Sequence, residues 1–282
     1  MIENSVVVGT SEIPTVIGRR TTFGHRCKVI GATVGNLCEI GNGSILLAGA
    51  HLGRGCILGE GTLIPPGVVV PDEAVVVGRP GRTVRRANDA DRARILQLRG
   101  GDLSLSSDPL REFTGKGKAM GKLYAYRDKL PTVAPSAHLF ESAEITGDVT
   151  VGERTIIGAG VKIIGDSHGP VRIGSDVQIL ENTVLHLLPD NELVLEDGVI
   201  IGPGAMIHGC RIGRGSVVEP AGIVCDFSDL GPNCTVRAGT VVKQRARFPA
   251  GAIVEGFPAR QVGSNSAPQP VPAWALRIED LT

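Results

Sequence analysis

Aliphatic residues recur at multiples of six positions along most of the chain, and glycine follows them directly. In the first part these pairs are Ile17-Gly18, Phe23-Gly24, Val34-Gly35, Ile40-Gly41, Leu52-Gly53 and Leu58-Gly59. In the second part they are Val151-Gly152, Ile157-Gly158, Ile173-Gly174, Ile201-Gly202, Ile212-Gly213 and Leu230-Gly231. A helix would bring apolar residues back every three or four positions. A six-residue period, with aliphatic residues turned inward and small residues at the corners, instead predicts a parallel β-helix.

Three hexapeptides close one triangular coil of about 18 residues. Each coil buries only a thin apolar plug, so coils must stack to be stable. The composition fits this arrangement, because 39 glycines supply corners and the 3% aromatic content suits a narrow interior. We therefore expect an all-β chain of stacked coils.

The pattern occurs twice. Residues 1–84 align without a gap on 179–262, at an offset of 178 residues, and the identities fall at corners and turns. Gly24 aligns with Gly202, for example, and Pro71 with Pro249. In both copies one step is a residue short, from Phe23 to Val34 in the first. These matches indicate an internal duplication with an incomplete first copy.

The duplication predicts two tandem β-helical units joined by a helix and a linker. The expected segments are a truncated β-helix at 1–85, a helix and linker at 86–119, a complete β-helix at 120–263 and a tail at 264–282. The helix is expected from Asp89 to Leu98, with an acidic residue near its start. Loops are expected at Gly165–Arg172 and Leu187–Leu193. The apolar residues around Trp274 suggest that the end of the tail docks on the protein.

Charge and cysteine content exclude several classes of function. With 29 basic and 29 acidic residues the formal net charge is zero, so we expect no nucleic-acid or membrane partner. No apolar run approaches the roughly 20 residues of a membrane span, and no secretory signal is visible. The six cysteines form no C-x-x-C motif, which favours reduced cysteines in a cytoplasmic protein.

Two histidines of the second copy are the main candidates for chemistry. His186 and His208 follow Leu185 and Ile207, the inward residues of their hexapeptides. Because side chains alternate along a strand, both histidines should point out of the coil. An exposed histidine without a role is the plainer alternative to a functional one.

Residues 120–263 resemble the γ-class carbonic anhydrase family. The motifs that carry the resemblance are Gly147-Asp148-Val149-Thr150-Val151-Gly152, Glu181-Asn182-Thr183-Val184-Leu185-His186, Ala205-Met206-Ile207-His208-Gly209-Cys210 and Glu255-Gly256-Phe257-Pro258-Ala259. The resemblance implies a left-handed β-helix and a trimer. It also implies zinc held between neighbouring prisms by three histidines, two from one subunit and one from the next. Such a site leaves a fourth position open, where the ion lowers the pKa of a bound water to about 7.

By this resemblance His186 matches the family's first zinc ligand and His208 the third. The second ligand precedes the third by five residues in the family. In this chain that place is Pro203, which cannot bind a metal.

The first copy shows the reverse pattern. His25 stands at the position equivalent to that proline, while Val8 and Ile30 stand at the equivalents of His186 and His208. Each copy thus keeps what the other lacks. We predict that a bound zinc ion has His186, His208 and His25 as its ligands, with His25 supplied by a different prism.

Other departures from the family weaken the case for catalysis. Ile164 replaces the family's arginine before the first ligand, although Asp166 keeps the neighbouring acid, and Leu180 replaces a glutamine beside the zinc-bound water. Even a complete site is therefore expected to be weakly active. No catalytic residue beyond the ligands is assigned.

Three classes of function follow. The first is zinc-dependent reversible hydration of CO2, a lyase reaction, at a site shared by the two copies of a trimer-based homo-oligomer. The second is a non-catalytic trimeric scaffold whose zinc site has decayed, so the status of the chain as an enzyme stays open. The third is a hexapeptide acyltransferase, with His25, His51 or His208 as the general base.

Overall fold

The computed structural model describes residues 5–99, 111–112, 121–166 and 168–281. The chain divides into two compact units, Met1–Ser107 and Asp108–Thr282. Each unit is described by itself. Most of the linker predicted at 86–119 lies outside the described residues, since only its first part and residues 111–112 are among them.

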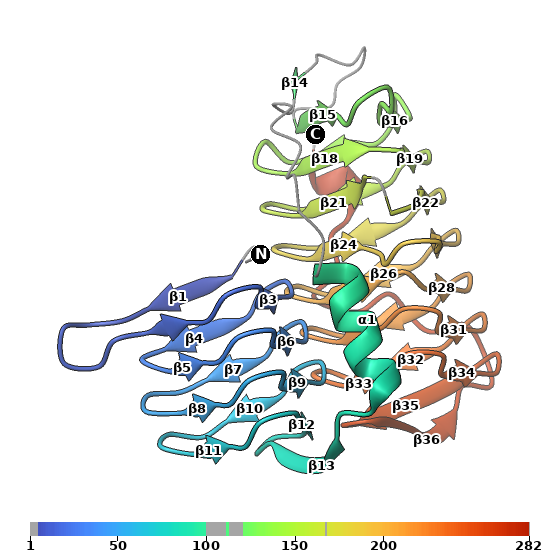
Figure 1. The fold of residues 1–282 in the computed structure, drawn as a ribbon. Coiled ribbons are helices and arrows are strands. Elements are labelled where there is room, and N and C mark those ends of the chain that lie inside the picture. The colour runs from blue at the N-terminus through green and yellow to red at the C-terminus, as the bar shows by residue number, and fades with distance from the viewer. Residues whose placement is uncertain (1–4, 100–110, 113–120, 167, 282) are drawn as a thin grey trace. The chain divides into compact units, whose positions relative to one another are not determined.

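Three parallel sheets of short strands form the faces of the β-helix in the first unit (Figure 1). One sheet contains β1 (Val6–Val8), β4 (Lys28–Ile30), β7 (Ile45–Leu46) and β10 (Leu63–Ile64). The next contains β2 (Val16–Ile17), β5 (Thr33–Val34), β8 (His51–Leu52) and β11 (Val69–Val70). The third contains β3 (Thr22–Phe23), β6 (Glu39–Ile40), β9 (Ile57–Leu58), β12 (Ala74–Val77) and, antiparallel to β12, β13 (Arg82–Arg86).

The second unit repeats this plan with longer sheets. The sheet that carries His186 and His208, here the histidine sheet, contains β14 (Arg111–Glu112), β15 (Lys122–Ala125), β18 (Glu144–Gly147), β21 (Lys162–Gly165), β24 (Val184–His186), β27 (Met206–His208), β30 (Ile223–Val224) and β33 (Val241–Val242). The second sheet contains β16 (Thr132–Val133), β19 (Val149–Val151), β22 (Val171–Ile173), β25 (Leu193–Leu195), β28 (Arg211–Ile212), β31 (Asp229–Leu230) and β34 (Arg247–Phe248). The third contains β17 (His138–Leu139), β20 (Ile156–Ile157), β23 (Gln178–Ile179), β26 (Ile200–Ile201), β29 (Val217–Val218), β32 (Thr235–Val236), β35 (Ala252–Gly256) and β36 (Ala259–Ser264).

The register of the strands follows the duplication. Val6 pairs with Lys28 in the first unit and Val184 with Met206 in the second, so each of these coils is 22 residues long. The next coil has 17 residues in both units, from β4 to β7 and from β27 to β30. This is the step that the sequence shows to be one residue short.

Alternation of side chains builds the core. On the histidine sheet the inward residues Leu185, Ile207, Val224 and Val242 are fully buried and belong to one continuous apolar core. The predicted fold class, an all-β parallel β-helix of hexapeptide repeats consistent with the left-handed type, is confirmed. The two loops predicted in the second unit also occur, between β21 and β22 and between β24 and β25.

One α-helix, α1 (Asp89–Arg99), follows the first β-helix. Asn88 caps it: its side-chain oxygen accepts from the Asp91 N–H (2.9 Å), and the Asp91 carboxylate accepts from the Asn88 N–H (2.8 Å). Arg94 then ties the helix to Glu39 on β6 at 2.9 Å. No helix among the described residues is long and apolar enough to cross a membrane.

The tail ends in a short 3-10 helix, η1 (Ile278–Leu281), and docks on the second unit as the sequence suggests. The side-chain amide of Gln178 on β23 donates to the carbonyl of Leu276 (2.9 Å) and accepts from its N–H (3.0 Å). One amide therefore satisfies both backbone groups of a single tail residue.

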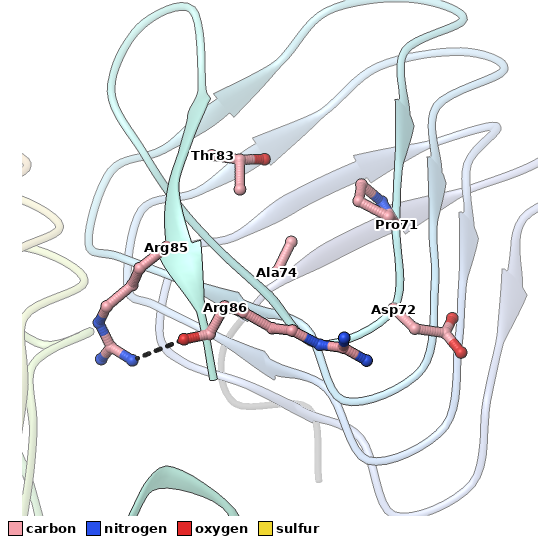
Figure 2. Close-up of a pocket in the computed structure, with 6 residues that line it drawn as sticks. All are labelled: Pro71, Asp72, Ala74, Thr83, Arg85 and Arg86. Atoms are coloured by element: carbon pink, nitrogen blue, oxygen red, sulfur yellow. Dashed lines mark hydrogen bonds between the residues drawn. The ribbon is translucent and has the colours of Figure 1, made fainter. Parts of the chain in front are cut away.

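A cavity of about 350 Å³ lies at the β12–β13 hairpin of the first unit (Figure 2). Its walls are formed by Pro71, Asp72, Ala74, Thr83, Arg85 and Arg86. The two arginines are occupied by acids, since Arg85 pairs with Asp91 and Arg86 with Glu73 at 3.1 Å. No histidine lines this cavity, so it is separate from the predicted chemistry.

Candidate metal centre

The structure brings His186 and His208 together on the outer side of the histidine sheet. They are register partners on the adjacent strands β24 and β27, and their ring centroids lie 5.3 Å apart with the rings nearly perpendicular. Leu185 and Ile207, which precede them, fill the core. The histidine side chains are only 8% and 9% exposed. Adjacent outward strand positions thus place two imidazoles within reach of one small ion.

A buried carboxylate orients His208. Oδ2 of Asp226 lies 2.5 Å from Nδ1 of His208, and the Asp226 side chain is 4% exposed. Oδ1 accepts hydrogen bonds from the N–H of Leu188 (2.9 Å) and from the amide of Asn191 (3.1 Å). Burial on its own would raise the pKa of Asp226, but the hydrogen bond and charge of His208, with the two further donors, lower it below its usual value. An ionised carboxylate only accepts, so Nδ1 of His208 carries the proton and Nε2 keeps its lone pair.

Gly209 makes this arrangement possible. Its φ of +34° is in the left-handed region. A Cβ atom at this position would lie 2.0 Å from the Asn191 amide nitrogen and 2.3 Å from Oδ1 of Asp226. Asn191 also donates to the carbonyl of Gly209 at 2.6 Å, and the N–H of Gly209 donates to the carbonyl of His186 at 2.8 Å. The glycine therefore lets the loop after β24 close over the histidine pair.

Asp166 and His168 lie on the other side of His186. Oδ2 of Asp166 is 3.5 Å from Nε2 of His186, and the ring centroids of His168 and His186 are 5.2 Å apart. The N–H of His168 donates to Oδ1 of Asp166 at 3.0 Å. Burial would raise the pKa of Asp166, but hydrogen bonding to His186, its charge and the contacts of His168 hold that pKa at about 2. The carboxylate is therefore ionised at neutral pH.

A cavity of about 300 Å³ adjoins Asp166 on the histidine sheet. It is lined by Tyr126, Glu144, Thr146, Lys162, Ile164 and Asp166. Glu144 and Lys162 form an ion pair across β18 and β21. Ile164, which replaces the family's arginine, thus places an apolar surface in this cavity.

The remaining predicted residues lie in the first unit. His25 occupies the corner after β3, where its N–H donates to the side-chain oxygen of Asn42 at 2.6 Å. Val8 and Ile30 are register partners on β1 and β4, the same relationship that joins the histidines on β24 and β27. His51 on β8 is exposed. Ligation of one ion by His25 together with His186 and His208 remains a prediction.

Sequence reasoning missed His168, Asn191 and Asp226. A signal existed for two of them, because His168 precedes His186 by 18 residues and Asp226 follows His208 by 18. That spacing is one coil of the β-helix. A search for acids and histidines one coil away from each candidate ligand would have found both.

The donor set of the second unit fits a zinc ion in part. Zinc takes imidazole nitrogens and carboxylate oxygens in fourfold coordination. A carboxylate on the far nitrogen of a ligating imidazole fixes its tautomer, as Asp226 does for His208. The described residues of this unit thus provide two suitably placed imidazoles and acids beside each of them.

Comparison with known proteins supports this reading of the fold. The model of the bacterial transferase hexapeptide (six repeats) matches residues 37–72, and that of the hexapeptide repeat of succinyl-transferase matches residues 14–48. A carbonic anhydrase of Geobacillus kaustophilus is 36% identical over 39% of this chain and 59% of its own length. The carnitine operon protein CaiE of Escherichia coli K12 is 32% identical over 49% of this chain and 70% of its own length. A solved Bacillus cereus structure named as an acetyltransferase is 32% identical over 51% of this chain and 84% of its own, with a TM-score of 0.50.

These matches define the class as hexapeptide-repeat β-helix proteins. Within that class, the chain belongs to the γ-carbonic-anhydrase-like family, which includes gamma carbonic anhydrase 2 of Arabidopsis thaliana at 29% identity. The chain spans 59% of the length of the Geobacillus and Arabidopsis relatives.

Proposed function

We propose that the protein is a zinc-dependent carbonic anhydrase of low activity, which reversibly hydrates CO2 at a centre held by His186, His208 and His25. The observation that carries the proposal is the register pairing of His186 with His208, with Asp226 on the far nitrogen of His208. The reciprocal pattern of the two copies supports His25 as the third ligand. The carbonic anhydrases among the relatives support the reaction.

The residues of the chain would divide the work as follows. His186 and His208 hold the ion from adjacent strands, and Asp226 keeps the Nε2 lone pair of His208 available. Zinc, when bound, lowers the pKa of a coordinated water to about 7 and so supplies a nucleophile at neutral pH. Ile164 and Leu180 offer no hydrogen bond to reacting groups, and for this reason we expect slow turnover.

The outer side of the histidine sheet supports a homo-oligomer, based on a trimer as in the family. Val184, Met206, Ile223 and Val241 directly precede inward core residues, so they face outward and form an apolar column beside the histidines. An outward apolar column of this kind favours packing against another β-helical surface. The six cysteines are all buried thiols, which supports a cytoplasmic location.

The experiment is CO2 hydration by stopped flow, with zinc-loaded, tag-free protein. The wild type should accelerate hydration, while His208→Ala and His25→Ala should lose the activity. His138→Ala is the matched control, because His138 lies on a different sheet of the second unit. If the zinc-loaded wild type is inactive, or if His208→Ala keeps full activity, the proposal is wrong.

Two other functions have specific support. The departures at Pro203, Ile164 and Leu180 favour a scaffold that has lost its metal site, and a metal-free oligomer would support it. The transferase hexapeptide matches in the first unit and the Bacillus cereus structure favour an acyltransferase. Retention of coenzyme A and thermal stabilisation by it would support that function.

A further inference from the structure

We propose that Asp166, His168 and His186 form a divalent-cation site contained within the second unit. The three residues each offer one ligand atom, and these atoms all lie within 4.8 Å of one another. The set shares His186 with the proposed carbonic anhydrase centre but needs no residue of the first unit. It also does not depend on CO2 being the substrate.

The distances suit a small ion. Zinc bonds of 2.0–2.2 Å in tetrahedral geometry put neighbouring ligand atoms roughly 3.4 Å apart. Nε2 of His186 and Oδ2 of Asp166 are separated by 3.5 Å. The ring of His168 stacks at a tilt of 33° on that of His186, with 5.2 Å between centroids. A modest inward movement of His168, whose side chain is one third exposed, would complete the set.

Neighbouring groups hold the ligands in the state that a metal requires. Nδ1 of His168 lies 3.1 Å from the carbonyl of Leu187, and since a carbonyl only accepts, Nδ1 carries the proton. Nε2 of His168 therefore keeps the lone pair. Asp166 is fixed by the N–H of His168 on Oδ1 and by Lys129, whose amine donates to the Asp166 carbonyl at 2.9 Å. Its second oxygen remains directed at His186.

The composition of the set indicates the class of cation. Two imidazoles and one carboxylate bind first-row divalent ions such as zinc, iron or cobalt, and leave open positions. The site sits beside the cavity that Asp166 also lines, so an ion there would be reached from that cavity. In this unit Pro203 removes the family's second histidine, and His168 supplies an imidazole from one coil away.

The test uses full-length, tag-free protein and competition titration with zinc and with cobalt. His25→Ala should keep one ion per chain, with a cobalt spectrum of two nitrogen ligands and one oxygen ligand. Adding His168→Ala, or Asp166→Asn as a second variant, should lower the affinity of that protein more than about 100-fold. Circular dichroism and melting temperature confirm folding, and His138→Ala serves as the control.

Three results would overturn the proposal: wild type that binds neither ion, His25→Ala that releases its ion, or a double variant that binds as tightly as His25→Ala. Failure of the carbonic anhydrase proposal is distinguishable from each of these. Wild type that keeps its ion but does not hydrate CO2 removes that function and leaves this site in place.

Discussion

Oδ2 of Asp226 lies 2.5 Å from Nδ1 of His208, from the next coil of the histidine sheet. This contact joins the loop after β24 to the candidate metal centre, because the same carboxylate accepts from Leu188 and Asn191. The stability of the loop and the orientation of the imidazole therefore depend on one buried group.

Asp226→Asn should destabilise the protein at pH 7 by about 1–3 kcal/mol, since hydrogen bonds to a charged acceptor are lost. The folded state lowers the pKa of Asp226, so its contribution is fully present above the unfolded pKa of about 3.9 and is lost as the pH falls through the folded pKa. The gap in free energy of unfolding between wild type and variant should thus shrink below about pH 4. Denaturant melts at several pH values measure it. The exposed Asp128→Asn is the control, and a gap that is constant with pH would contradict this account.

Gly209→Ala should destabilise the second unit more than Gly239→Ala does. Both glycines have positive φ, +34° and +67°, but a Cβ at Gly239 meets nothing within 4 Å. At Gly209 it would collide with Asn191 and Asp226, which adds about 1–3 kcal/mol of overpacking. Chemical denaturation of the two variants compares them. Equal losses would show that the loop adjusts without cost.

Gln178→Ala should release the tail from the second unit. The chain has a single tryptophan, Trp274, located two residues before Leu276, so its fluorescence reports on the tail alone. We expect acrylamide to quench Trp274 more strongly in this variant, with little change in melting temperature. Gln261→Ala, whose amide contacts only the exposed strand β36, is the control. Unchanged quenching would mean that other contacts hold the tail.

The buried cysteines should be unreactive in the folded protein. Burial raises the pKa of the Cys27 thiol to about 12 and also raises that of Cys210, so little thiolate forms at pH 8. An aromatic disulfide reagent should label the native protein slowly and all six thiols after unfolding. Fast labelling of several thiols in the native protein would contradict the buried positions of these side chains.

The sequence predicted the fold closely because the hexapeptide period is a direct record of the coil. It placed Leu185 and Ile207 inward and their following histidines outward, and the one-residue-short step appears as a 17-residue coil. The partners of the histidines were harder to predict. Whether Asp226 or His168 reaches a ring depends on how corners and loops stack between coils, and the alternation along one strand carries no such information. Asn191 lies in a loop, where the period is interrupted.

The most direct test of the account is the zinc content of wild type and His186→Ala, both purified without a histidine tag and dialysed after loading. His186 belongs to the proposed centre with His208 and His25, and also to the set with Asp166 and His168. We predict about one zinc per chain in the wild type and in His138→Ala, and none in folded His186→Ala. A wild type without zinc, or a His186→Ala variant with as much zinc as the wild type, would contradict the assignment of a metal centre to this face.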